Sequence, residues 1–263
     1  MSNTKTTTQD ENLNDSPEAL LPPPSIAEYL VFPFFLIAFI STLILFEIIQ
    51  RANKLIYPKN TEYSILWFNR FVLYSLRIAL VRLHIEGKEK LPKEGPAVVI
   101  SNHQSMFDIS SIHVAVAELK PRFVAKKELG QGIPGVSTCL RYSNAALIDR
   151  SDPAQALPEI ERFAKFLKEK KACGVIFPEG TRARSDSIKS FKKRGPLTLM
   201  DAVKPAWIIP VTIQNSWKLQ ARKRGPLPLG VDINLKIHTP LFLEENGNSN
   251  DIFRKAESMI RLD

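Results

Sequence analysis

The stretch from Tyr29 to Phe46 contains no charged residue in 18 positions, and it constrains the fold more than any other feature of the chain. As an α-helix it would be about 27 Å long, close to the thickness of the hydrocarbon layer of a bilayer. Apolar residues surround this helix with no polar stripe, which favours a membrane helix over a helix buried in a protein core. Pro33 could kink it near its start, so a half-embedded hairpin stays open beside a full span.

The two flanks of this segment differ in charge. Residues 1–28 carry one basic and five acidic side chains, whereas Arg51, Lys54 and Lys59 follow the segment directly. Cleavable signal peptides begin with basic residues, so we expect the segment to stay attached. Basic residues gather on the cytoplasmic side of membrane segments, which predicts that the rest of the chain faces the cytoplasm. Residues 1–25 are rich in Thr, Asn, Asp, Ser and Pro, a composition typical of a disordered tail.

Residues 64–85 form a second apolar stretch, in which Arg70 and Arg77 recur at helical spacing. This pattern predicts an amphipathic helix that lies in the headgroup layer with its arginines toward lipid phosphates, although an ordinary surface helix would look similar. We therefore divide the chain into a disordered tail (1–25), membrane-anchoring helices (26–85) and a larger domain (86–263).

Beyond Gly87 the chain alternates short apolar β runs with helical patterns, which is typical of an α/β domain. We expect a mixed, largely parallel sheet covered by helices, preceded by the N-terminal membrane-associated helical segment. Ligands of such sheets bind at the carboxyl ends of the strands. The expected strands are 97–101, 122–126, 144–149, 172–178, 207–214 and 231–238, and the expected helices are 107–119, 134–142, 153–170, 196–203 and 250–262.

The net charge is +9, and because residues 1–28 are acidic the remainder carries an excess of +13. Such an excess suits an anionic partner, namely nucleic acid, a lipid surface or a phosphorylated substrate. A nucleic-acid binder would not explain the apolar N-terminal segment. Cys139 and Cys173 are far apart, which predicts neither a disulfide framework nor a metal site and favours a reducing compartment. His84, His113 and His238 have no acidic partner at an interpretable spacing, and we expect them to be structural.

His103 and Asp108 lie on the predicted turn between strand 97–101 and the helix that follows it. Within one helix the two side chains would point about 140° apart and could not meet. If His103 ends the strand and Asp108 begins the helix, the carboxylate can hold one ring nitrogen and leave the other free as a base. A strand-end histidine beside a helix-capping aspartate is the alternative.

A tight turn, Pro178 to Thr181, follows another predicted strand and leads to Arg182. Gly180 lets backbone amides point outward, and guanidinium groups grip phosphate oxygens in pairs, so the turn suits a phosphate monoester. Arg150, at the end of a third strand, offers another cation. An ordinary surface loop with a salt bridge would have the same residues.

These two segments carry a resemblance. Asn102 to Asp108 matches the NHxxxxD motif of the glycerolipid acyltransferase family, whose members include the lysophosphatidic acid acyltransferases, and Phe177 to Arg182 matches its FPEGTR motif without a change. The family's second and fourth motifs are matched more loosely, in the family's order, at 146–150 and 209–211. Asn144 and Leu147 depart from the second motif, which leaves the acceptor preference open. The resemblance covers roughly residues 80–215.

The resemblance implies a membrane-bound enzyme that moves a fatty acyl group from acyl-coenzyme A or acyl carrier protein to the free hydroxyl of a lysophospholipid. Lysophosphatidic acid, giving phosphatidic acid, is the first acceptor to expect. His103 would be the general base and Asp108 would orient it, without a covalent intermediate. The residues implied to hold the acceptor phosphate are Arg150, Glu179, Gly180, Thr181 and Arg182. The expected partners are therefore the lysolipid, the acyl donor and membrane lipids, with no nucleic acid, metal or bound cofactor.

Other activities fit the sequence less well. Gly130 to Gly135 spells the GxGxxG fingerprint of dinucleotide-binding folds, but four residues separate it from the preceding strand and Pro134 interrupts it. Ser137 lacks the second glycine of a hydrolase nucleophile elbow. A catalytically silent membrane adaptor on the same scaffold is the remaining rival, and the intact His103 and Asp108 argue against it.

Overall fold

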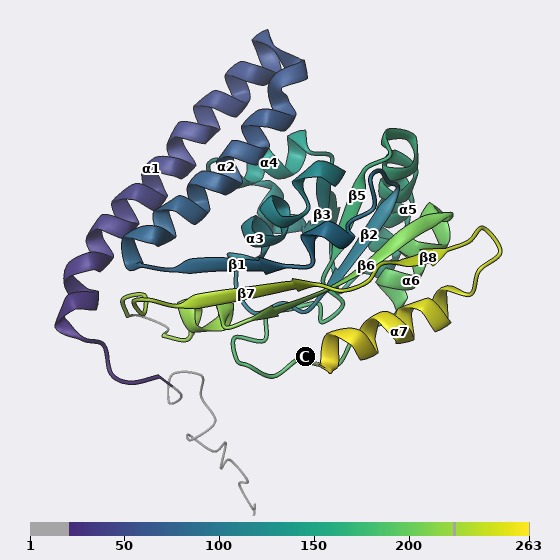
Figure 1. The fold of residues 1–263 in the computed structure, drawn as a ribbon. Coiled ribbons are helices and arrows are strands. Elements are labelled where there is room, and N and C mark those ends of the chain that lie inside the picture. The colour runs from purple at the N-terminus through teal and green to yellow at the C-terminus, as the bar shows by residue number, and fades with distance from the viewer. Residues whose placement is uncertain (1–20, 223–224, 263) are drawn as a thin grey trace, which may run out of the picture.

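The computed structural model describes residues 21–222 and 225–262, so residues 1–20 of the predicted tail lie outside the described residues. One sheet forms the body of the molecule, and two long helices lean against one side of it (Figure 1). The helices are α1 (Ile26–Ile56), α2 (Thr61–Leu76), α3 (Asp108–Ala115), α4 (Val136–Tyr142), α5 (Pro153–Lys170), α6 (Arg194–Val203) and α7 (Ser249–Arg261). The strands are β1 (Arg82–Glu86), β2 (Ala97–Ser101), β3 (Pro121–Lys126), β4 (Ala146–Ile148), β5 (Cys173–Ile176), β6 (Ala206–Gln214), β7 (Asp232–Ile237) and β8 (Leu241–Leu243).

The sheet has the strand order β1-β7-β6-β2-β5-β3-β4, and β8 also pairs with β6. Strands β7 and β8 run antiparallel to β6, and the other pairings are parallel. This confirms the mixed, largely parallel sheet that the sequence predicts. Every residue of the central strands β2 and β5 is buried, which agrees with their uninterrupted runs of small and apolar residues.

Two strands differ from the expectation. Residues 82–85 belong to the stretch predicted to be helical, but the chain from Arg82 to Glu86 forms the edge strand β1, paired with β7. The helical prediction is wrong here. Leu83 and Ile85 alternate with exposed residues, which is the period of two of a strand. The apolar run of α2 directly before it hides this short alternation. Strand β8 was not predicted either, since three residues are too few to show a period.

Successive residues of β2 pack against different helical layers. Val98 and Ile100 lie in one apolar cluster with residues of α5, α6 and α7, such as Phe163. Val99 belongs to a second cluster on the other face of the sheet, with residues of α1, α2 and α3, such as Ile112. Burying a side chain of this size contributes about 1.5–3 kcal/mol. The two layers therefore hold β2 and the loop at its carboxyl end in a fixed position.

Helix α1 is attached to the α/β domain near both of its ends. Glu28 pairs with Arg222 at 2.9 Å, and Glu47 accepts a hydrogen bond of 2.8 Å from the Gly135 amide. Between these points the ring of Phe35 meets that of Phe107 edge-on at 6.5 Å. The helix continues through Pro33 without a break. Helix α1 therefore lies along the domain rather than projecting from it, and α2 returns beside it (Figure 1).

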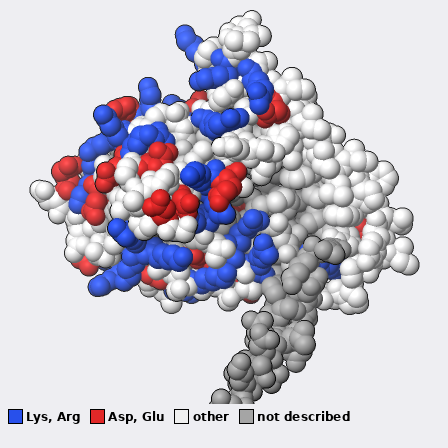
Figure 2. All heavy atoms as spheres, turned by 180° about the vertical axis from the view of Figure 1, so that it is seen from behind, with Lys and Arg blue, Asp and Glu red and all other residues white. Residues whose placement is uncertain are grey.

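The outer side of α1 and α2 is an exposed apolar surface. Figure 2 shows that the side formed by these helices is almost free of charged residues, in contrast to the rest of the molecule. In the described part of the chain, α1 is the one helix long and apolar enough to cross a membrane, by length and composition alone. Large apolar side chains exposed on the two helices include Leu30, Phe34, Ile37, Ile40, Ile44, Ile48, Trp67, Phe71 and Tyr74.

His113, on α3, predicts how stability depends on pH. Neither ring nitrogen has a hydrogen-bond partner among the described residues, and burial, followed by the charge of Arg122, lowers the pKa of His113 from 6.5 to about 3. The unfolded chain takes up a proton below about pH 6.5, but the folded chain does not until about pH 3. Stability should therefore fall by about 1.4 kcal/mol per pH unit through this window.

We expect His113→Phe to remove this acid slope, because a phenyl ring can stay near Phe123 without taking up a proton. Thermal unfolding of the wild type and the variant at pH 7.5 and pH 5 measures the loss of stability on acidification. Equal losses of stability in the two proteins would show that another group causes the acid sensitivity.

Candidate active site

Two neighbouring parallel strands bring the two sequence motifs together. Residues Ile100 of β2 and Ile176 of β5 are paired in register, so the loops that follow these strands leave the sheet at the same edge. The loops then bond directly, because the Ala183 amide donates to the His103 carbonyl at 2.8 Å. This position at the carboxyl ends of the strands is the one expected for a ligand site in an α/β sheet.

Asn102 fixes the start of the first loop. Its side-chain amide donates to the Ile213 carbonyl and accepts from the Ile213 amide, both at 2.8 Å. The Asn102 side chain is almost fully buried, and its two bonds extend the link between β2 and β6 beyond the last strand residue. The backbone just before His103 is therefore tied to the end of β6.

His103 and Asp108 are in the contact that their spacing predicts. Asp108 is the first residue of α3, and its Oδ2 lies 2.9 Å from His103 Nδ1. Because a carboxylate accepts hydrogen bonds, Nδ1 is the nitrogen that carries the hydrogen, and Nε2 presents its lone pair. No hydrogen bond from another described residue reaches Nε2. The pair has the geometry of a base and the group that orients it.

Asp108 is held by four further donors. Its Oδ2 accepts from the amides of Gln104 and Ser105 at 2.6 and 2.8 Å. Its Oδ1 accepts from the hydroxyls of Ser105 and Ser216 at 3.1 and 2.5 Å. The carboxylate is fully buried, so these bonds fix its position and, through it, the plane of the His103 ring.

Phe177 covers one face of the histidine. The two rings are stacked with centroids 4.0 Å apart and an angle of 16° between their planes, and His103 is only 7% exposed. The first residue of the second motif thus shields the His103 ring of the first motif from water.

Glu179 connects the two loops rather than pointing outward. Its Oε1 accepts from the His103 amide at 2.7 Å and its Oε2 from the Lys189 amide at 3.1 Å. Burial raises the pKa of Glu179, and the two amide bonds partly offset that effect. Since both carboxylate oxygens bond to the protein's own backbone, the geometry favours a positioning role for Glu179 over direct contact with a phosphate.

Arg150 and Arg182 lie on the two sides of the Gly180 turn. Arg150 Nη1 bonds to the Gly180 carbonyl, and Arg182 Nη1 donates to Gln220 Oε1 at 2.9 Å. Desolvation and then the charge of Arg182 lower the pKa of Arg150, and desolvation and then the charge of Arg184 lower the pKa of Arg182. An anion bound between these guanidinium groups would relieve the repulsion. Thr181 is exposed at the tip of the turn.

The Gly180 position itself needs glycine. Its φ is +71°, in the left-handed region that other residues rarely adopt, and the Lys192 side chain lies 3.5 Å from where a β-carbon would be. Lys189 Nζ also donates to the Arg182 carbonyl at 3.0 Å. The turn therefore has cationic side chains beside it, including Lys189 and Lys192.

Ser216 and Gln220 are parts of the site that sequence reasoning missed. They lie on a 3₁₀ helix, Ser216–Gln220, that follows β6. Ser216 bonds to Asp108, and Gln220 Oε1 accepts from both Arg182 and the Met106 amide. One available signal was that β6 ends beside β2, so that its following residues belong to the same edge of the sheet. Neither residue type is distinctive by itself.

The rival motifs have structural explanations. The Gly135 amide, at the end of the GxGxxG sequence, bonds to Glu47 of α1, so this loop helps to hold α1. The Ser137 hydroxyl accepts from the Ile133 amide and donates to the Leu129 carbonyl within its own loop. Neither arrangement resembles a nucleotide site or an activated nucleophile.

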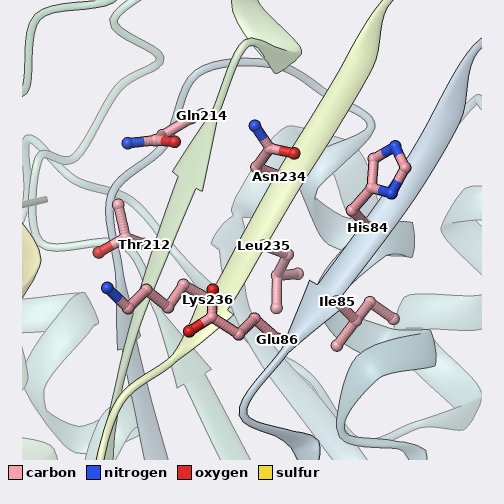
Figure 3. Close-up of a pocket in the computed structure, with 8 residues that line it drawn as sticks. All are labelled: His84, Ile85, Glu86, Thr212, Gln214, Asn234, Leu235 and Lys236. Carbon is pink, nitrogen blue, oxygen red and sulfur yellow. The ribbon is translucent and has the colours of Figure 1, made fainter.

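A second histidine–aspartate pair lies on the far strands of the sheet. His84 Nε2 is 2.9 Å from Asp232 Oδ1, so His84 does have an acidic partner, which is 148 positions away in the sequence. Hydrogen bonds from Arg82 and then His84 lower the pKa of Asp232 to about 2. Figure 3 shows His84 on β1 at the margin of an open polar cleft of about 300 Å³ formed by β1, β7 and β6. Unlike His103, His84 is exposed.

Comparisons with known proteins show which proteins this chain is similar to. A chloroplastic 1-acyl-sn-glycerol-3-phosphate acyltransferase of Arabidopsis thaliana is 32% identical over 68% of this chain and 48% of its own length. An enzyme of the same name from Pseudomonas aeruginosa is 28% identical over 64% of this chain and 65% of its own. The match thus spans about half to two thirds of these relatives.

Similarity extends to a solved structure and to a family model. The crystal structure of the 1-acyl-sn-glycerophosphate (LPA) acyltransferase PlsC from Thermotoga maritima superposes with a TM-score of 0.73 at 26% identity, covering 89% of this chain and 93% of that one. The Acyltransferase family model matches residues 82–214, which include both loops of the site and half of the chain. The chain therefore belongs to the acyltransferase family.

Proposed function

We propose that this protein transfers a fatty acyl group from an acyl thioester to the free hydroxyl of lysophosphatidic acid, giving phosphatidic acid. The observation that carries the proposal is His103, held by Asp108 at 2.9 Å with Nε2 free, in direct backbone contact with the Arg182 turn. A base and an anion-binding turn at one edge of the sheet fit an acceptor that has a hydroxyl and a phosphate. The names of the similar proteins support the same acceptor.

The reaction follows from the orientation of the ring. Nε2 of His103 takes the proton of the acceptor hydroxyl as its oxygen attacks the thioester carbonyl, and Asp108 stabilises the imidazolium. The tetrahedral intermediate then collapses, the carbon–sulfur bond breaks, and the proton passes to the leaving sulfur. No bond between the protein and the acyl group is needed, because the nucleophile belongs to the substrate.

The acceptor phosphate would lie at the Gly180 turn. Arg150 and Arg182 supply charge, and the turn supplies the backbone amide of Thr181, since the Gly180 amide already donates to the Phe177 carbonyl. Glu179 positions this turn against the His103 backbone, so that the phosphate and the base keep a fixed separation. Holding the acceptor by its phosphate removes most of the entropic cost of bringing its hydroxyl to the base.

The exposed face of α1 and α2 suits a position in one leaflet of a membrane. We propose embedding rather than crossing, because α1 is bound to the domain at both Glu28 and Glu47. A one-chain acceptor and a two-chain product both reside in the bilayer, so the site need not extract either. The cytoplasmic leaflet is proposed because its anionic lipids attract the basic residues that follow the apolar segment.

Maleimide labelling tests this arrangement. On a background lacking Cys139 and Cys173, we expect single cysteines at Ser25 and Lys59 to react with an impermeant reagent from the same, cytoplasmic side. Labelling from opposite sides would mean that α1 crosses the bilayer.

The activity itself is tested with purified full-length protein. We expect this protein to convert lysophosphatidic acid to phosphatidic acid, identified by mass spectrometry. The donors to compare are acyl-coenzyme A and acylated acyl carrier protein, and the better one would identify the donor partner. Lysophosphatidylcholine and lysophosphatidylglycerol serve as competing acceptors. Product from one of these instead would assign a different lysolipid acceptor, and no product with any pair would favour a silent membrane adaptor.

Ser216 gives a milder prediction. Ser216→Ala removes the 2.5 Å bond to Asp108 Oδ1 but leaves the other donors, so we expect kcat to fall about tenfold with little change in either KM. Ser187→Ala, which removes the same atom from an exposed part of the second loop, should leave kcat unchanged. If both variants keep full kcat, Ser216 does not position the carboxylate.

A further inference from the structure

A groove of about 1,090 Å³ lies between the second half of α2 and the edge strand β1. Its lining includes Leu73 of α2, Leu83 and Ile85 of β1, and Val114 of α3. None of the residues that line it belongs to the candidate active site. A groove of this size, lined by apolar side chains and arginines, can enclose a substantial part of a small-molecule ligand.

Two arginines border this groove without acidic partners, Arg70 on α2 and Arg77 directly after its end. The guanidinium of Arg70 lies 5.0 Å from the ring centre of Trp67, and that of Arg77 lies 5.3 Å from the ring centre of Tyr74. In residues 21–222 and 225–262, neither arginine forms an ion pair. By contrast, Arg82, which also lines the groove, is bonded to both oxygens of Asp232. The aromatic rings hold Arg70 and Arg77 while their N–H groups stay available to an anion.

The groove is continuous with the exposed apolar surface of α2. Tyr74 and Leu80 line the groove and are themselves 45% and 64% exposed. Ile78, in the same segment, is exposed as well. Figure 1 shows α2 and β1 on the side of the molecule where the helical pair leans, so the groove adjoins the surface proposed to contact the bilayer. An occupant could therefore enter from the lipid phase without crossing water.

We propose that this groove binds one anionic phospholipid of the membrane, with its charged headgroup facing Arg70 and Arg77 and one acyl chain along Leu73, Leu83 and Ile85. The site is separate from the active site, and its lipid is not a substrate. Charge selects the headgroup, since two unpaired cations favour a lipid with net negative charge over a zwitterionic one. The apolar lining holds a chain, which distinguishes this site from general attraction to a charged surface.

Native mass spectrometry of the full-length protein in detergent tests the proposal with dioleoyl phosphatidylglycerol and dioleoyl phosphatidylcholine as probes. We expect one phosphatidylglycerol to be retained per chain, in preference to phosphatidylcholine. The Arg70→Gln/Arg77→Gln variant should weaken this binding about tenfold or more. Lys165→Gln/Lys168→Gln on α5 removes the same charge from exposed positions elsewhere and should leave binding unchanged.

A second variant tests the acyl-chain part of the site. Leu83→Trp should fill the groove and abolish retention while Arg70 and Arg77 stay in place. Equal retention of the two lipids, or undiminished binding in the arginine variant, would overturn the proposal, and a dimer in place of a bound lipid would assign the groove to a second copy of the chain. Acyl transfer to a detergent-dispersed acceptor should be the same in all these variants. Loss of lipid binding with normal acyl transfer would therefore be distinguished from failure of the proposed activity.

Discussion

Replacing His103 with alanine is expected to reduce acyl transfer by about 10³- to 10⁴-fold, because it removes the group proposed to take the acceptor's proton. The loss should appear in kcat, since the turn proposed to bind the phosphate is untouched and the acceptor KM should stay close to normal. Turnover of purified protein, followed by mass spectrometry of phosphatidic acid, measures it. His103→Gln keeps a polar side chain against Phe177 and should be equally inactive.

The matched control for this prediction is His84→Ala. His84 also lies 2.9 Å from an aspartate, Asp232, but on the exposed strands away from the site. It should lose no activity. Circular dichroism and thermal unfolding would show whether the His103 variants keep the fold. Turnover within a few-fold of normal in a folded His103→Ala protein would contradict the assignment of the base.

The local part of the site could be predicted from the sequence because its residues are close in the chain. The step from a buried strand to a helix fixes where His103 and Asp108 can lie, and five positions are enough for the two to meet. The strand before Pro178 similarly predicts the turn with Gly180, whose positive φ fits the glycine. The alternation of strands and helices predicted the class of sheet for the same reason, because the spacing of apolar residues within each segment indicates a strand or a helix.

The rest depends on contacts that no local pattern records. Ser216 reaches Asp108 from 108 positions away, and Gln220 reaches Arg182 only because β6 lies beside β2. Glu179 belongs to the recognised motif, but the sequence could not show that its carboxylate faces two backbone amides. A motif thus identifies which residues gather at a site before it identifies which of them point into it.

Helix α1 shows a second limit. A segment that is apolar all round favours a membrane helix, but its composition could not show that one face packs on the domain while the other is exposed. The bonds of Glu28 and Glu47 decide the arrangement, yet each involves a partner more than 80 positions away. The division into an anchoring part (26–85) and a domain (86–263) stays a prediction.

Arg182→Gln is expected to raise the acceptor KM by about 10- to 100-fold while kcat stays within a few-fold of normal. A hydrogen bond to a charged group contributes about 1.5–3 kcal/mol. Arg182 is half-buried, so water replaces the lost bond less well than it would at an exposed site. The donor KM should not change, since the acyl thioester carries its reacting carbonyl to His103 rather than to this turn. Initial rates over a matrix of acceptor and donor concentrations separate the two constants.

The matched control is Arg184→Gln, two residues further along the same loop. Arg184→Gln removes the same positive charge, so both variants weaken the long-range attraction of an anionic acceptor equally. Only Arg182 is bonded to Gln220 and thereby held beside the turn. A large rise in acceptor KM for Arg182→Gln alone would place the phosphate at the Gly180 turn. Equal changes in both variants would mean that the loop attracts the acceptor only by its charge, and Arg182 would then lose its assigned role. A loss in kcat rather than KM would instead place Arg182 at the oxygen of the tetrahedral intermediate, where donors act only in the transition state.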